Sequence, residues 1–241
     1  MEQLNPEKIL TPDRFMEYEQ SIKKSDLIPN VLKLITKPNM KICDIGGASG
    51  VFLNEIIKTS KYIIRAYNME VLPEYESKQL NEKINFLHAS ILDNTLNDKS
   101  FDIISFRHLL HHLVGRTLKQ TKQNQTRALE EMFRLLKPGG HLIFEEEVNE
   151  IPIFSQTIYY LSYFAHKHKI KVKSFDAGTV IVYFMNREEI KRILLGNSSK
   201  FNLIIKTEKY TRWNTELKWK LTLLMSRVGT VGFCIEKLKD V

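Results

Sequence analysis

The chain of 241 residues has little of several features that would place it in a specialised class of proteins. Its two cysteines, Cys43 and Cys234, are too few for a disulfide framework or for a zinc site built from cysteine alone. No apolar run reaches the roughly 18 residues that a transmembrane helix needs. The N-terminal stretch MEQLNPEKIL is too polar for a secretory signal. We therefore expect a cytoplasmic protein without a transmembrane segment.

The composition is that of a folded domain, with 43% hydrophobic and 27% charged residues. The length suits one α/β domain covering residues 1–241. The charge is uneven, because residues 1–150 carry a net −1 and residues 151–241 a net +9. A basic C-terminal third can face an anionic partner such as nucleic acid. Its lysines are scattered among apolar residues, which favours a solvated surface instead.

Short apolar runs alternate with helical patterns through residue 147, which predicts βαβ units and a mainly parallel sheet. We expect five strands in this part, and two further strands close to the C-terminus. Helices are expected in the intervals and in the last third of the chain. The expected strands cover 41–45, 62–69, 84–88, 101–106, 142–147, 201–207 and 230–237. The expected helices cover 12–24, 49–60, 126–136, 151–168, 186–195 and 217–225. One further helix is expected to start at Pro29, and another is expected to follow the strand at 62–69 and to run through Gln79.

The segment KICDIGGASG, residues 41–50, is the most informative in the chain. Here a predicted strand leads into a glycine-rich turn and then into the start of a helix. Glycines permit the tight turn and let a ligand approach the backbone, and a helix N-terminus favours an anionic group. The lysine of an ATP-binding phosphate loop is missing, because Val51 and Phe52 follow Gly50.

An acidic residue, Glu70, comes 20 positions after Gly50, close to the end of the second predicted strand. A carboxylate at this place can accept hydrogen bonds from both hydroxyls of a ribose. The sequence therefore predicts a cofactor that contains ribose. Asn68 is the competing position, and a surface role for Glu70 before Pro73 is the alternative.

Four stretches in this order resemble the class I S-adenosylmethionine-dependent methyltransferases, chiefly over residues 30–150. They are the loop DIGGASG at 44–50, MEVLPE at 69–74, FDIISFRHLLHHL at 101–113 and RLLKPGG at 134–140. The resemblance implies a Rossmann-like, doubly wound α/β fold with a seven-stranded sheet and an antiparallel last strand. It also implies a helical N-terminal cap over 1–36 and a substrate-pocket insertion over 151–185, which holds many aromatic residues.

The resemblance further implies that S-adenosylmethionine binds at the carboxyl ends of the strands. Two residues depart from the family pattern, because Ala48 stands where glycine is usual and Ser90 stands in place of an aspartate. Carried over position by position, the cofactor residues are Asp44, Gly46, Gly47, Ala48, Gly50, Glu70, Leu72, Ala89, Ser90, Ser105, Phe106 and Arg107.

The candidates for proton transfer lie directly after the fourth predicted strand and at the end of the fifth. His108 and His111 are suitable general bases, with a structural role as the alternative for each, and His112 is expected to be structural. Within the glutamate run 145–147, Glu146 is the candidate for orienting an amine or a hydroxyl of the acceptor. The alternative is that all three glutamates form a cluster at the edge of the sheet with no role in the chemistry. We expect no metal, since no nearby carboxylate completes a zinc set with these histidines.

The sequence thus predicts a methyltransferase that acts on oxygen, nitrogen or carbon of a small, hydrophobic or aromatic molecule. An RNA or protein acceptor is an alternative that the basic C-terminal third motivates. A binding module that kept the fold without catalysis is a second alternative, because fold alone does not establish activity. The sequence leaves the oligomeric state undetermined.

Overall fold

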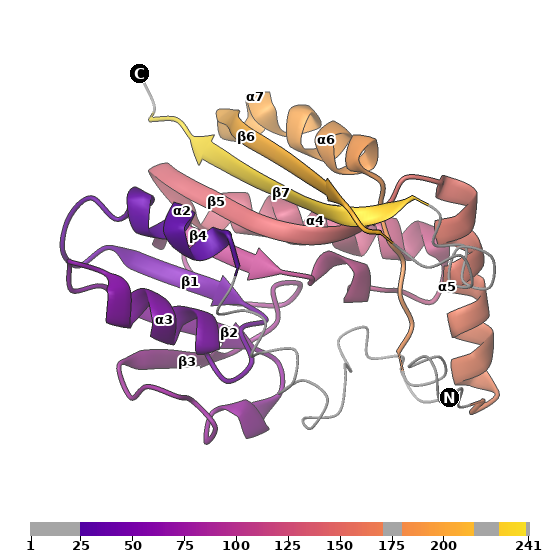
Figure 1. Ribbon diagram of the computed structural model, residues 1–241, viewed down its shortest axis with the longest axis horizontal. Helices are drawn as coiled ribbons and strands as arrows, with labels where there is room; N and C mark the ends of the chain where they lie inside the picture. Colours follow the sequence, from indigo (N-terminus) through magenta and orange to yellow (C-terminus); the bar gives the residue numbers. More distant parts are fainter. Residues whose placement is uncertain (1–24, 171–179, 215–226, 240–241) are drawn as a thin grey trace.

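The computed structural model describes residues 25–170, 180–214 and 227–239, which form one sheet with helices on both faces (Figure 1). The sheet has seven strands in the order β3-β2-β1-β4-β5-β7-β6. Strands β1 to β5 are parallel, and β7 runs antiparallel to both of its neighbours. The Rossmann-like sheet with an antiparallel last strand is therefore confirmed. The strands are β1 Lys41–Ile45, β2 Arg65–Glu70, β3 Ile84–His88, β4 Phe101–Arg107, β5 Leu136–Asn149, β6 Leu203–Arg212 and β7 Val228–Lys237.

The helices divide between the two faces of the sheet. One face carries α2 (Leu27–Leu34) and α3 (Val51–Thr59), and the opposite face carries α4 (Leu118–Leu135) and α6 (Arg187–Gly196). A short helix, α7 (Ser198–Phe201), follows α6. Helix α5 (Pro152–Lys167) stands beyond the sheet, at the end toward which β1 and β4 point (Figure 1). None of the helices within the described ranges is long and apolar enough to span a bilayer.

Alternation along the central strands explains why both faces are covered. In β4, Ile103 packs with the helices α2 and α3, whereas Ile104 and Phe106 pack with α4. A strand that is apolar on both sides must be buried on both sides. The same alternation puts Ser105 and Arg107 on the face of α3, next to Asp44 of β1. The alternation of side chains along β4 thereby determines on which face of the sheet Ser105 and Arg107 lie at its carboxyl end.

Most of the predicted elements are present, but one helix is wrong. Only a single 3-10 turn, Pro73–Tyr75, stands where a helix through Gln79 was predicted. The side chain of Gln79 donates to the carbonyl oxygens of Ala48 and Tyr75, which folds this segment back onto the glycine loop. The helix predicted at 126–136 is longer and starts at Leu118, with Thr117 as its N-cap. The helices predicted over 12–24 and 217–225 lie outside the described residues.

A candidate cofactor and methyl-transfer site

The glycine loop joins β1 to α3 in a conformation that few side chains permit. Gly46 and Gly50 have φ of 69° and 76°, in the left-handed region. Gly47 is required for space, because a Cβ there would lie 2.5 Å from Asn68 Oδ1 and 2.8 Å from Asp44 Oδ2. The glycines at these three positions are therefore needed by the backbone path of the loop.

Ala48 adopts φ of 45°, so it takes the left-handed conformation of the glycine it replaces. An L-residue in this region costs roughly 1–2 kcal/mol. We expect Ala48→Gly to raise the free energy of unfolding by roughly 1 kcal/mol, the relief of strain exceeding the extra entropy of the unfolded chain. Urea unfolding measures this, with Ala89→Gly, at a residue with ordinary φ, as the matched control that should destabilise. An equal loss of stability in both variants would contradict the strain at Ala48.

Glu70 and Asn68, the two candidates for the ribose, have different positions. The buried amide of Asn68 donates to the carbonyl oxygen of Ala48 at 2.7 Å, behind the loop. The carboxylate of Glu70 accepts from the Ala48 N–H at 3.2 Å and from the Val71 N–H at 2.8 Å. Glu70 lines the cavity described next, and Asn68 does not. The geometry therefore favours Glu70 as the ribose acceptor.

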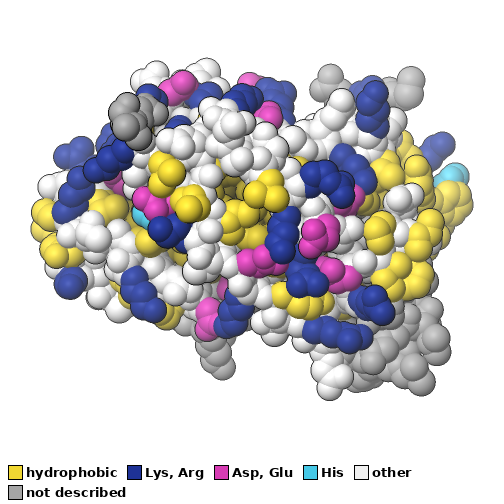
Figure 2. Space-filling model, turned by 90° about the horizontal axis from the view of Figure 1, so that it is seen from above, with side chains coloured by type: hydrophobic (Ala, Val, Ile, Leu, Met, Phe, Trp, Pro, Cys, Tyr) yellow, Lys and Arg dark blue, Asp and Glu magenta, His cyan; other side chains and the backbone are white. Residues whose placement is uncertain are grey.

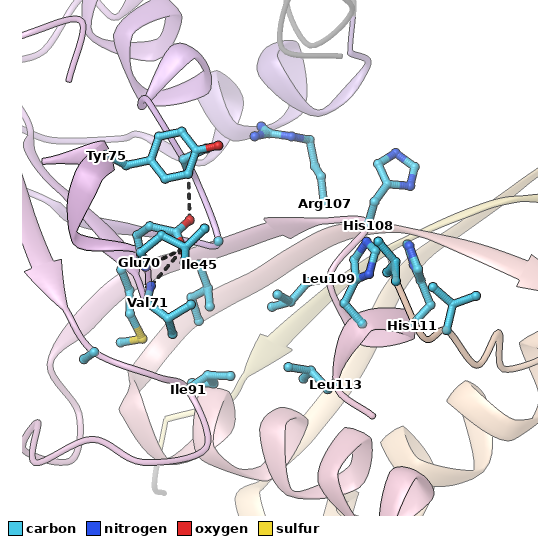
Figure 3. A pocket seen from close by; sticks show the side chains of 18 of the residues that line it. Ile45, Glu70, Val71, Tyr75, Ile91, Arg107, His108, Leu109, His111 and Leu113 are labelled. Atoms are coloured by element: carbon cyan, nitrogen blue, oxygen red, sulfur yellow. Dashed lines mark hydrogen bonds between the residues drawn. The ribbon is translucent and has the colours of Figure 1, made fainter. Parts of the chain in front are cut away.

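One cavity of about 290 Å³ opens at the carboxyl ends of β1, β2 and β4 (Figure 3). Gly46, Ala48 and Glu70 lie at one end, and His108 and His111 at the other. Apolar side chains line the space between and beyond them. These are Ile45, Met69, Val71, Leu72, Ala89, Ile91, Leu109, Leu113, Val180 and Val182.

The cavity takes in half of the predicted cofactor residues directly. Gly46, Ala48, Glu70, Leu72, Ala89 and Arg107 line it. Asp44, Gly47 and Gly50 shape the loop behind it, and Ser105 Oγ donates to Asp44 Oδ1 at 2.7 Å. Phe106 stacks on Phe144 in the core with ring centroids 4.4 Å apart, and the Ser90 hydroxyl accepts from the Leu92 N–H. These six residues support the site from behind its wall.

His111 and Glu146 form a buried pair at the second end of the cavity. His111 Nδ1 lies 2.6 Å from Glu146 Oε1, and the two side chains are 7% and 1% exposed. Glu146 Oε2 also accepts from the Leu110 N–H at 2.6 Å. Burial raises the pKa of Glu146 to about 7, although the backbone donors favour the carboxylate, and burial lowers the pKa of His111. Since Nδ1 is held by Glu146, Nε2 is the ring nitrogen left for a ligand.

The ring of His111 is fixed from a second direction by the segment after α5. Phe184 stacks on the His111 ring with ring centroids 4.9 Å apart, and the carbonyl oxygen of His111 accepts from the Tyr183 N–H. Val180 and Val182 of the same segment line the cavity. The aromatic side chains of α5 do not line it within the described residues, because Tyr159 is buried against Gly115 while Tyr160 and Phe164 face outward.

His108 has a left-handed backbone, with φ of 49°, and its Nδ1 lies 3.5 Å from Glu147 Oε1. Burial lowers the pKa of His108 to about 4 and raises the pKa of Glu147 to about 7. Glu147 and His112 line the cavity although the sequence did not single them out for it. Alternation along β5 places Glu147 on the face of Glu145 and opposite to Glu146, and this is the sequence signal that could have indicated its position. Across the described part of the chain, no three metal-ligating side chains come together.

Comparison with known proteins identifies the family. Residues 16–197 match the family described as "Methyltransferase domain". The chain belongs to the methyltransferase-domain family. An S-adenosylmethionine-dependent methyltransferase from Methanosarcina mazei shares the fold with a TM-score of 0.62 and 17% identity, over 90% of this chain and 99% of that one. The resemblance drawn from the sequence is thus confirmed for the family and the fold, and that structural relative is described as dependent on S-adenosylmethionine.

Two further relatives show how far function varies on this scaffold. A demethylmenaquinone methyltransferase from Clavibacter sepedonicus is 24% identical over 108 residues, 44% of this methyltransferase-domain chain and 40% of the relative. The matched region thus spans less than half of that relative. The [4+2]-cyclase SpnF has the same fold with a TM-score of 0.60 and 12% identity, over 92% of this chain and 82% of that one. Likeness of fold therefore leaves the acceptor open.

The described residues fit S-adenosylmethionine. Gly46 and Ala48 of the glycine loop line the cavity, and Glu70 presents a carboxylate to the same space, which is the group that can accept hydrogen bonds from ribose hydroxyls. Val71, Leu72, Ala89 and Ile91 give that end an apolar wall suited to an adenine ring. When bound, the cofactor supplies an electrophilic methyl group.

Proposed function

We propose that this methyltransferase methylates a small molecule at an atom that must lose a proton, with His111 as the general base and Glu146 as its positioning residue. The observation that carries the proposal is the single cavity that joins Glu70 and the glycine loop to His111. The acceptor atom is an oxygen, a nitrogen or an acidic carbon. Its placement between the two ends of the cavity puts it within reach of both the methyl donor and the base.

The chain's own residues would act by orientation and proton transfer. Glu146 accepts a hydrogen bond from His111 Nδ1–H, which fixes the tautomer with a lone pair on Nε2. Nε2 takes the proton of the acceptor while the new bond to the methyl carbon forms and the carbon–sulfur bond breaks. The products are the methylated acceptor and S-adenosylhomocysteine. Burial lowers the pKa of His111, so the ring is neutral before the reaction, and the Glu146 carboxylate would stabilise the imidazolium that forms when the proton arrives.

The walls around His111 support an acceptor with an apolar body. Leu109, Leu113, Val180 and Val182 line the same cavity as His111. Such walls bind a ring or a short hydrocarbon part by excluding water. The partial match to a demethylmenaquinone methyltransferase agrees with an aromatic acceptor. Cytoplasmic location and one domain over 1–241 stay predictions.

Calorimetric titration with S-adenosylmethionine and S-adenosylhomocysteine tests the proposal first. Binding of both is expected, with a stabilisation of about 2.7 kcal/mol at a ligand concentration 100 times Kd. Phenols, amines and hydroquinones are then assayed for production of S-adenosylhomocysteine. Absence of binding by folded protein would refute the enzyme assignment and favour a binding module.

Replacing Glu70 with alanine is expected to weaken binding of S-adenosylhomocysteine by about 1–3 kcal/mol, or 5- to 150-fold. The carboxylate would lose its hydrogen bonds to the ribose, and the loop would lose the contact at the Ala48 N–H. Glu74→Ala, at an exposed position in the following turn, is the matched control and should bind as the parent does. Unchanged affinity in Glu70→Ala would remove the ribose assignment.

The nucleic-acid alternative receives little support from the surface. Figure 2 shows Lys and Arg side chains spread over this face and interleaved with acidic and apolar ones. Among the described residues, several lysines of the basic C-terminal third form ion pairs, such as Lys191 with Glu208 and Lys206 with Glu236. RNA binding that falls steeply with added salt would favour the alternative.

A further inference from the structure

Arg107 is a buried cation whose hydrogen-bonding capacity is mostly unused. It ends β4 and lines the cavity, and its side chain is 6% exposed. Nη2 donates to Asp44 Oδ2 at 3.3 Å, but Nε and Nη1 are buried and have no hydrogen-bond partner among the described residues. The guanidinium carbon Cζ lies over the Phe52 ring, 4.1 Å from the ring centroid. A guanidinium carries five N–H donors, so most of them are unsatisfied here.

The arrangement is costly as it stands. A buried donor without a partner loses its hydration and gains nothing in return, and the penalty is larger for a charged group. Asp44 offsets part of the charge, but this carboxylate also accepts from Ser105, and burial raises its pKa against the effect of Arg107. The other charged or titratable neighbours are Glu145 and His108. Glu145 is engaged by the Ser25 hydroxyl at 3.0 Å.

We propose that Arg107 receives a carboxylate of a ligand bound in the cavity, through its unpartnered Nε and Nη1. A planar guanidinium matches a carboxylate in shape and charge, and such charge-assisted hydrogen bonds are stronger than neutral ones. The inference rests on the proposed function, because it assumes that cofactor and acceptor share this cavity. Two ligands can bring the carboxylate, namely the amino-acid end of the cofactor and an acid acceptor placed near His108.

The geometry also explains why an arginine is used here. The Phe52 ring of α3 packs against the guanidinium, and Asp44 holds one of its nitrogens, so the remaining donors are fixed in direction before a ligand arrives. A pre-organised donor set loses little entropy on binding. A lysine at this position has neither the plane nor the fork.

The test uses Arg107→Gln and Arg107→Lys in two binding arms. In the first arm, each protein is titrated with S-adenosylhomocysteine and with 5′-methylthioadenosine, which lacks the amino-acid end. In the second arm, protein saturated with S-adenosylhomocysteine is titrated with benzoate and with benzamide, which match in size but not in charge. Arg127→Gln, on the exposed side of α4, is the matched control. Melting temperatures of the free proteins report any damage to the fold.

We expect the substitution of Arg107 to change binding in one of the two arms. If the cofactor brings the carboxylate, S-adenosylhomocysteine binds at least tenfold more weakly to Arg107→Gln, less so to Arg107→Lys, and methylthioadenosine binds as before. If the acceptor brings it, the parent prefers benzoate over benzamide at least tenfold and Arg107→Gln loses the preference. Equal loss for both nucleosides, or no discrimination in either arm, overturns the proposal. Failure of the parent to bind S-adenosylhomocysteine at all would instead refute the proposed function.

Discussion

The variant His111→Gln is expected to lower kcat by about 10²- to 10⁴-fold, the usual contribution of a general base. Glutamine can occupy much of the imidazole space and can still hydrogen bond to Glu146, but its amide has no basic nitrogen. The proton of the acceptor then has no base at this end of the cavity. Affinity for S-adenosylhomocysteine should stay within about twofold of the parent, because the ribose end of the site is untouched.

Two measurements separate a base from a structural histidine. The melting temperature of His111→Gln reports the lost stacking on Phe184, and kcat at saturating cofactor reports the chemistry. His166→Gln, at an exposed position on α5, is the matched control and should turn over normally. A His111→Gln enzyme with parental kcat would assign the pair with Glu146 to the fold alone.

The same assay ranks His108 against His111. On sequence grounds, both residues were equal candidates for the general base. In the structure, His111 has a 2.6 Å contact to a buried carboxylate, whereas His108 lies 3.5 Å from Glu147. A short contact fixes one tautomer, and a longer one leaves the ring less constrained. We therefore expect the larger loss of kcat in His111→Gln than in His108→Gln.

Local patterns were sufficient to predict the sheet and to bring the residues proposed for the cofactor to one edge of it. The glycine loop, Glu70 and the strand at 101–106 lie close together in sequence and follow one another in βαβ order. Their contacts are set by neighbouring parallel strands, so strand order alone brings them to one edge. The boundaries were less accurate, as β5 shows by starting at Leu136 rather than at residue 142.

The acceptor end depends on contacts between distant segments, which periodicity does not reveal. The Tyr183 N–H pairs with the carbonyl oxygen of His111 across 72 positions of sequence, and this contact brings Val180 and Val182 to the cavity. The aromatic residues of α5 suggested a pocket, yet the described ones turn into the core or outward. The unpartnered N–H donors of Arg107 could not be predicted from the sequence either, because they depend on which side chains surround Arg107 on its face of β4.

The second large effect is expected in the pH dependence of kcat, which should rise with pH through about 7. Above that pH the pair of His111 and Glu146 holds one proton, on Nδ1, and Nε2 is free to accept. Burial raises the pKa of Glu146 to about 7, so the pair takes up a second proton below it. Wherever that proton resides, on Glu146 or on the imidazole, Nε2 then carries a hydrogen and cannot act as the base. The rate should fall about tenfold per pH unit, and so about 100-fold at pH 5.

Glu147 provides the matched control for this assignment, since burial raises its pKa to about 7 as well. Glu146→Gln cannot take up the proton, so its profile should lose the inflection near 7, at a kcat lower than the parental value. Glu147→Gln should keep the inflection, because the pair of His111 and Glu146 is intact, although removal of the neighbouring charge shifts the midpoint downward. His108, with a pKa near 4, titrates below this range. An inflection that disappears in Glu147→Gln and persists in Glu146→Gln would move the base function to His108 and Glu147.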